Sequence, residues 1–207
     1  MARRFRDRRR PAGRGRVHRT VRRRLLVLCE GQVTEPGYIR GLERWLKSAT
    51  VEVVIPKIHG VPRTLVAEAV ERKRDAKTRA KRERDPFLDY DEVWCVFDVD
   101  AHPKLGEARE LARAHDIHLA ISNPCFELWL LLHFRESPGA RHRHDVQRLV
   151  GSYLEGYAKR VSFPLLGPGL DDACRRAARM EQEAKRDGEA GRNPSTGVHR
   201  LVASIRP

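Results

Sequence analysis

Three acidic residues stand directly after two apolar runs of the chain. Glu30 follows residues 25–29, and Asp98 and Asp100 follow residues 93–97. A short, continuous apolar run is typical of a strand buried on both faces, as in a parallel sheet. Because ligands gather at the carboxyl ends of such strands, we expect the three carboxylates to lie together. Carboxylates this close repel one another unless a cation neutralises them, and hard oxygen ligands favour Mg²⁺ or Mn²⁺. The chemistry that such a site supports is metal-assisted cleavage of phosphodiester bonds in nucleic acid.

Glu127 is a fourth acid with a reason to join them. It lies within residues 126–132, a predicted helix that is apolar on nearly every face and therefore expected to be buried. A buried carboxylate is costly unless it binds a metal, pairs with arginine or accepts hydrogen bonds. The predicted helix follows the fourth strand at the same edge of the sheet, so we favour metal ligation, directly or through water, over an arginine pair.

Phosphoryl transfer also needs positive groups or proton donors near the phosphate. Lys104 is a candidate for the cation because it is close in sequence to the two aspartates. His199, with Ser195 and Thr196 at a predicted helix start, could supply phosphate contacts, although these residues also fit an ordinary helix cap. His133 is expected in the core or at its rim.

The elements that must position these residues alternate between strands and helices. Apolar and β-branched runs predict strands, and apolar residues at helical spacing between them predict helices. Strands are expected near residues 25–29, 51–55, 93–97 and 117–121, and helices near 34–46, from 62, 105–112 and 123–132. Further helices are expected near 145–159, 171–187 and after 193–196, with Asn123 as the N-cap of the one at 123–132. This order predicts an α/β fold with a mostly parallel four-stranded sheet, covered by helices on both faces, and a C-terminal helical extension.

Positive charge is concentrated at the start of the chain. The first 24 residues contain twelve arginines and one acid, Asp7, whereas the whole chain carries a net charge of +14. We therefore predict a disordered arginine-rich tail at 1–22, an α/β catalytic core at 23–135 and a helical extension at 136–207. The tail either contacts phosphates without regard to sequence or serves solubility. Arginines and histidines also alternate at 141–144, and we interpret this run as a solvated loop.

Cysteine usage and hydropathy indicate the compartment. The four cysteines, Cys29, Cys95, Cys125 and Cys174, form no CxxC pair, and three of them lie within apolar runs. They are expected to be buried thiols in a reducing environment rather than disulfides or zinc ligands. No stretch approaches the roughly 18 apolar residues that a membrane span requires. We expect a cytoplasmic protein that makes no contact with a membrane.

The combination of a strand ending in Glu-Gly and a later strand ending in Asp-x-Asp resembles the Toprim fold of topoisomerases, primases and OLD-type nucleases. Four blocks together resemble the RloB family over about residues 24–206; they read LLVLCEGQVTEPGYIRGL, YDEVWCVFDVD, ISNPCFELWLLLHF and NPSTGVHRLV. The resemblance implies a Toprim-like catalytic core and a metal-dependent nuclease activity on DNA or RNA. It also implies a role in prokaryotic defence against phage or foreign DNA, and a partner ATPase of the ABC/AAA type encoded nearby.

The chain departs from the pattern of these families in one place and follows it loosely in another. Many Toprim enzymes extend the motif to Asp-x-Asp-x-Asp, but here the last position is His102, so other ligands must complete the site. OLD-type nucleases place a second acid soon after the first glutamate, and Glu35 answers to it one position further on. Glu35 is either a metal ligand or an acid that the helix dipole favours in a first turn.

Two other functions fit parts of the pattern. A catalytically weak subunit that binds nucleic acid or a partner would explain both the arginine tail and the missing third aspartate. A haloacid-dehalogenase-type phosphotransferase also uses Asp-x-Asp, but on its first strand. Here the motif follows the third strand, behind a glutamate, and we discount that interpretation.

Overall fold

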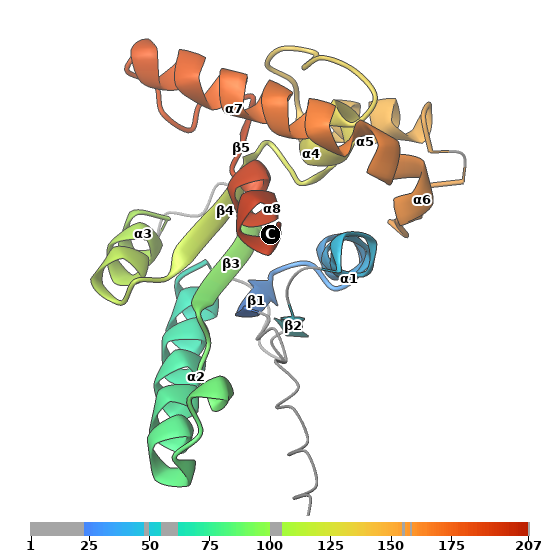
Figure 1. Ribbon diagram of the computed structural model, residues 1–207. Helices are drawn as coiled ribbons and strands as arrows, with labels where there is room; N and C mark the ends of the chain where they lie inside the picture. Colours follow the sequence, from blue (N-terminus) through green and yellow to red (C-terminus); the bar gives the residue numbers. More distant parts are fainter. Residues whose placement is uncertain are drawn as a thin grey trace, which may run out of the picture.

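A computed structural model describes residues 23–47, 50–54, 62–99, 105–154, 156–157 and 159–206. Several predictions from the sequence lie outside these ranges: the arginine-rich tail at 1–22, the ligand Asp100, the departure at His102 and the cation Lys104. The described residues form a five-stranded sheet in the order β2-β1-β3-β4-β5, with helices around it (Figure 1).

The first four strands are parallel and the fifth is antiparallel. They are β1 (Arg24–Cys29), β2 (Thr50–Val54), β3 (Glu92–Asp98), β4 (His118–Asn123) and β5 (Ser195–Thr196). The α-helices are α1 (Thr34–Leu46), α2 (Pro62–Glu83), α3 (Leu105–Ala114), α4 (Glu127–Leu132), α5 (Arg143–Gly151), α6 (Phe163–Leu166), α7 (Leu170–Arg186) and α8 (Val198–Ile205). Two 3₁₀ turns, η1 (Pro86–Leu88) and η2 (Gly167–Gly169), complete the fold.

Side chains of β1 alternate between two hydrophobic clusters, one on each face of the sheet. Leu25 and Val27 belong to a cluster with residues of α1, α4, α5, α7 and α8. Leu26 and Leu28 belong to a second cluster with residues of α2 and α3. All of these side chains are fully buried, which explains why the strand is apolar throughout rather than alternating. The predicted α/β fold with helices on both faces is confirmed.

The C-terminal part of the sheet differs from the prediction in two ways. The sheet has five strands rather than four, because Ser195–Thr196 pairs with the end of β4 and the last helix begins only at Val198. A strand of two residues carries no periodicity that a sequence could show. Asn123 is the last residue of β4 and not a helix N-cap, since α4 begins at Glu127; its side-chain amide donates to Gly191 O at 2.9 Å instead.

The strand order creates a crevice between β1 and β3. Connections from these two neighbouring strands leave in opposite directions, to β2 on one side and to β4 on the other. In open α/β sheets such a switch point opens the space in which ligands bind, at the carboxyl ends of the strands. Glu30 and Asp98 lie at the carboxyl ends of these two strands.

Other expectations concern the cysteines and the hydropathy of the helices. All four cysteines are free, and Cys29, Cys95 and Cys125 are buried, as predicted. Within the described part of the chain, none of the helices combines the length and apolar character needed to span a membrane.

Candidate active site

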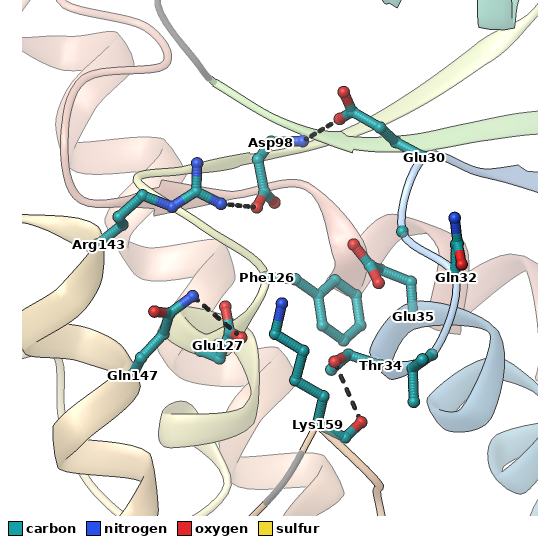
Figure 2. Close-up of a pocket in the computed structure, with 12 residues that line it drawn as sticks. Glu30, Gln32, Thr34, Glu35, Asp98, Phe126, Glu127, Arg143, Gln147 and Lys159 are labelled. Carbon is teal, nitrogen blue, oxygen red and sulfur yellow. Dashed lines mark hydrogen bonds and ion pairs between the residues drawn. The ribbon is translucent and has the colours of Figure 1, made fainter. Parts of the chain in front are cut away.

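A cavity of about 410 Å³ opens at the carboxyl edge of the sheet, and four acidic side chains line it (Figure 2). Glu30 follows β1 and Asp98 ends β3, while Glu35 lies in the first turn of α1 and Glu127 is the first residue of α4. The structure therefore brings together every predicted ligand that falls among its described residues. Three of the four side chains, Glu35, Asp98 and Glu127, are less than 10% exposed.

Pairing of β1 with β3 fixes the first two acids. The backbone N–H of Glu30 donates to Val96 O at 3.0 Å, which continues the ladder one residue beyond β1. The Glu30 carboxylate then accepts a hydrogen bond from the backbone N–H of Asp98 at 3.3 Å. Backbone geometry thus holds both acids at the crevice.

Asp98 is the most constrained of the acids. Its Oδ2 atom accepts a hydrogen bond from the Arg143 guanidinium at 3.3 Å, but no described residue bonds to the buried Oδ1 atom. Burial raises the pKa of this carboxyl well above its ordinary value, and the nearby carboxylates of Glu35 and Glu127 raise it further against the opposing effect of Arg143. A buried carboxylate oxygen without a partner needs a proton or a cation.

Glu35 packs against the turn that follows β1, and the glycine of Glu-Gly makes this possible. A Cβ atom at Gly31 would lie 2.0 Å from the Glu35 Oε2 atom, so any side chain there would displace the carboxylate. Burial raises the pKa of Glu35, and the carboxylates of Glu127 and Glu30 add to the effect. The position is therefore more than an ordinary exposed first-turn acid.

Glu127 is held by side chains from the C-terminal half of the chain. Its Oε1 atom accepts hydrogen bonds from the Gln147 amide at 3.4 Å and from the Tyr157 hydroxyl at 3.3 Å. Tyr157 Oη lies 3.5 Å from the Thr34 hydroxyl, which ties this network back to α1. Every residue of α4 is buried, as the sequence predicts.

Two cationic side chains also line the cavity. Arg143, the first residue of α5, lies beside Asp98, and Lys159 extends its amino group toward Glu35 and Glu127 (Figure 2). The carbonyl oxygen of Lys159 accepts a hydrogen bond from the Thr34 hydroxyl at 3.1 Å, which fixes the backbone at this position. The cavity is thus lined by four carboxylates and two cations, and the charges are interspersed rather than separated (Figure 2).

The donor set fits Mg²⁺ or Mn²⁺. It consists of carboxylate oxygens, which these hard ions prefer, and it includes the Asp98 oxygen that has no partner in the described part of the chain. In the described ranges, however, no three acids already converge at metal-binding distances from a common point. Binding of an ion would therefore draw the carboxylates together.

Comparison with known proteins follows the same residues. A family model described as RloB-like protein matches residues 25–205, a span that contains every residue of the cavity. The chain belongs to this family. Searches of curated proteins and of solved structures give no match. The resemblance to the RloB family inferred from the four sequence blocks is confirmed, and the fold is consistent with a Toprim-like α/β core.

The structure places the site candidate His199, and also His133, away from the cavity. His199 lies on α8, where its Nε2 atom is 3.0 Å from the Glu181 carboxylate and its Nδ1 atom is 3.1 Å from Thr196 O. His133 is buried in the core, as expected, between Leu166 O and the Tyr38 hydroxyl. Burial lowers the pKa of His133 to about 4. Neither histidine lines the cavity that holds the acids.

Four residues of the cavity network are absent from the candidates that the sequence supplies. Arg143 belongs to a run interpreted as a solvated loop, and that interpretation is wrong for this residue, since it begins α5 and pairs with Asp98. Gln147, Tyr157 and Lys159 carry no local signal, because their elements reach the site only through long-range packing. The apolar spacing of α5 could have shown which face of this helix packs inward, but not what it packs against.

Proposed function

We propose that the protein is a nuclease that hydrolyses phosphodiester bonds in DNA or RNA with the help of Mg²⁺ or Mn²⁺. The observation that carries this proposal is Asp98, which is buried beside three other acids and leaves one carboxylate oxygen without a partner among the described residues. A cavity that concentrates negative charge at the switch point of a parallel sheet is suited to a divalent cation.

The acids and the cations of the cavity have different tasks in this proposal. Glu30 and Asp98, with Glu35 and Glu127, would hold the ion, and the ion would polarise a phosphoryl oxygen and activate water. Arg143 and Lys159 would bind the phosphate, because guanidinium and ammonium groups complement its charge. Tyr157 and Gln147 orient the Glu127 carboxylate through their hydrogen bonds.

Membership of the RloB-like family supports the wider setting that the sequence resemblance implies. In that setting the protein acts in the cytoplasm, in prokaryotic defence against phage or foreign DNA, together with an ABC/AAA-type ATPase encoded nearby. Purification should therefore include the product of a neighbouring ATPase gene.

Cleavage assays test the proposal. Plasmid, single-stranded DNA and total tRNA are incubated with the protein, alone and with the partner ATPase, in Mg²⁺, Mn²⁺ or EDTA. We expect metal-dependent cutting that Asp98→Asn and Glu30→Gln abolish while circular dichroism stays unchanged. Glu107→Gln is the matched control, since Glu107 is an exposed acid paired with Arg63 on the opposite face of the sheet. Absence of nicking in either metal, with the partner present, would refute the nuclease assignment.

A second candidate is a subunit that binds nucleic acid or a partner but cleaves weakly. It is favoured by the arginine-rich composition of residues 1–22 and permitted by His102 in place of a third aspartate. This candidate predicts that Asp98→Asn binds nucleic acid as well as the wild type, which itself cuts weakly or not at all. Deletion of residues 1–22 should then weaken binding and flatten its dependence on salt concentration.

A further inference from the structure

A second cavity, of about 400 Å³, lies beside β4 on the outer edge of the sheet. Residues of α3, α7 and α8 and of the segment around β5 line it, and none of them lines the cavity of the four acids. Its volume lies within the range of about 300–1,000 Å³ that small-molecule sites occupy. Its chemistry differs from that of the first cavity, because two arginines and several aliphatic side chains line it with one acid, Glu181, instead of four.

Two arginines from different elements face this second cavity. Arg200 of α8 donates to Leu119 O at 3.2 Å and lies 3.7 Å from the Glu181 carboxylate, so its guanidinium is held against β4. Arg109 of α3 is exposed and makes no ion pair with any residue in the described ranges. Two guanidinium groups on one cavity are a site for an anion with several oxygens, such as a phosphate.

A glycine lies close to each of these two guanidinium groups. Gly197 donates its N–H to Ile121 O at 2.9 Å, and a Cβ atom there would lie only 2.7 Å from Arg200 Nη2. Gly191 has a positive φ of 85°, and a Cβ atom there would lie 3.4 Å from Arg109 Nη2. A side chain at position 197 would therefore displace the Arg200 guanidinium, whereas a Cβ atom at position 191 would make an ordinary contact with Arg109.

Glu181 lines the same cavity but does not oppose an anion there. Its carboxylate already contacts the Lys185 amino group at 2.8 Å and the His199 imidazole at 3.0 Å, in addition to Arg200. The Glu181 carboxylate thus has three partners, and Lys185 and Arg200 are cations that compensate its charge. Arg109 remains as a positive charge that no described acid neutralises.

Part of the remaining lining is apolar. Leu119 and Ile121 lie two residues apart on β4, so their side chains share the face of the sheet that borders the cavity, and Ile117 precedes the strand. Leu119 and Ile121 are only partly buried, although they belong to the hydrophobic cluster on that face. His118 also lines the cavity, and its ring is stacked on Trp94 with centroids 4.8 Å apart. A planar ring would find contact area here that a bare phosphate would not use.

We propose that the second cavity binds a nucleoside phosphate. Arg109 and Arg200, with the hydroxyl of Ser195, contact the phosphate, and the base lies against the aliphatic side chains Leu119 and Ile121. Free nucleotides and the terminal phosphate of a nucleic acid share this chemistry. The inference goes beyond the proposed nuclease activity and does not depend on it, because the two cavities have no lining residue in common.

Isothermal titration calorimetry of the whole chain in EDTA tests the inference. The titrants are AMP, adenosine, inorganic phosphate and an oligonucleotide with either a 5′-phosphate or a 5′-hydroxyl end. We expect AMP to bind more tightly than adenosine or phosphate, and Arg109→Ala to weaken AMP by about 10- to 100-fold, the usual effect of losing a charged hydrogen bond. Arg113→Ala, one turn further along α3 and outside the cavity, is the matched control.

The remaining arms locate the site and its natural source. Asp98→Asn should leave AMP binding unchanged, whatever it does to cleavage, and its loss in that variant would assign the ligand to the first cavity and overturn the inference. Equal affinity of AMP for Arg109→Ala and the wild type, or no saturable binding at millimolar AMP, would overturn it as well. Tighter binding of the 5′-phosphorylated oligonucleotide than of AMP supports the site as a receptor for nucleic-acid ends, and the reverse supports a free nucleotide.

Discussion

Replacement of Asp98 by asparagine should stabilise the protein in the absence of metal while removing its response to Mg²⁺. The wild-type carboxyl is 9% exposed, one of its oxygens has no partner in the described residues, and burial and neighbouring carboxylates raise its pKa. Asparagine has almost the same shape but no charge to desolvate. A functional group held at a cost to stability is expected where a site waits for a ligand.

The size of the effect follows from two opposing contributions. A buried charged oxygen without a hydrogen bond costs about 1–3 kcal/mol. The substitution also loses the ion pair with Arg143, whose side chain is 33% exposed, so that solvent screens the pair to about 1 kcal/mol or less. Subtracting about 1 kcal/mol for the ion pair leaves a net gain in the free energy of unfolding of about 0–2 kcal/mol, which raises the melting temperature by up to about 8 °C in a chain of this size.

Thermal unfolding in EDTA at neutral pH measures this gain. A raised pKa in the folded state means that the penalty appears as the pH rises from the ordinary value of 3.8 toward the folded value. The difference between variant and wild type should therefore shrink as the pH is lowered. Saturating Mg²⁺ should stabilise the wild type by mass action but leave Asp98→Asn unchanged. Asp116→Asn is the control, since Asp116 is exposed and its hydrogen bond from Lys73 lowers its pKa, so no stabilisation is expected.

Two results would contradict this reasoning. A lower melting temperature of Asp98→Asn in EDTA would show that the ion pair with Arg143 outweighs the burial of the charge. Equal stabilisation of both proteins by Mg²⁺ would show that the ion binds elsewhere, and the proposed metal site would then be wrong.

Three further predictions use other residues of the fold. Gly31→Ala should displace the Glu35 carboxylate, whose oxygen lies 2.0 Å from the new Cβ position, and lower cleavage by about tenfold or more in a folded protein; cleavage at the wild-type rate would remove Glu35 from the site. Tyr157→Phe removes the hydroxyl that bonds to Glu127 and should weaken Mg²⁺ binding in calorimetry without a change in secondary structure; unchanged affinity would count against a role of Glu127. His133 has a pKa of about 4 instead of 6.5, so the unfolded chain binds more protons between these values and stability falls as the pH drops through them. Urea unfolding should show a loss of about 3 kcal/mol across this range that is absent in His133→Gln; a parallel pH profile in the variant would argue against it.

The acids of the cavity could be predicted from the sequence because local sequence patterns indicate their positions. Glu30 and Asp98 each end an apolar run, and parallel strands bring their carboxyl ends to one edge whatever the rest of the chain does. Burial of Glu127 follows from an apolar helix, and it is observed. The weakest of these predictions, for Glu35, needed the structure, since only the close approach to Gly31 separates it from an ordinary first-turn acid.

The two cations of the cavity could not be predicted, because only long-range packing brings them to the site. Arg143 stands 45 residues beyond Asp98 and reaches it because α5 packs on α4, a contact that no local pattern encodes. Its neighbours in an alternating run of arginine and histidine made a solvated loop the simpler interpretation. Lys159 depends on the hydrogen bond between its carbonyl and Thr34, which again joins distant segments.

This difference between the acids and the cations has a chemical consequence. The sheet sets the positions of Glu30 and Asp98, because β1 and β3 are paired by backbone hydrogen bonds and the Asp98 N–H donates to the Glu30 carboxylate. Arg143 and Lys159 sit on α5 and on the segment that follows it, so the packing of the C-terminal half determines how much positive charge reaches the acids. A divalent ion would bind less tightly when the side chains of Arg143 and Lys159 lie among the carboxylates, and more tightly when these side chains lie outside the cavity. Under the proposed function, the balance between metal and phosphate in this site would therefore depend less on the acids, which the sheet holds in place, than on the elements that carry the cations.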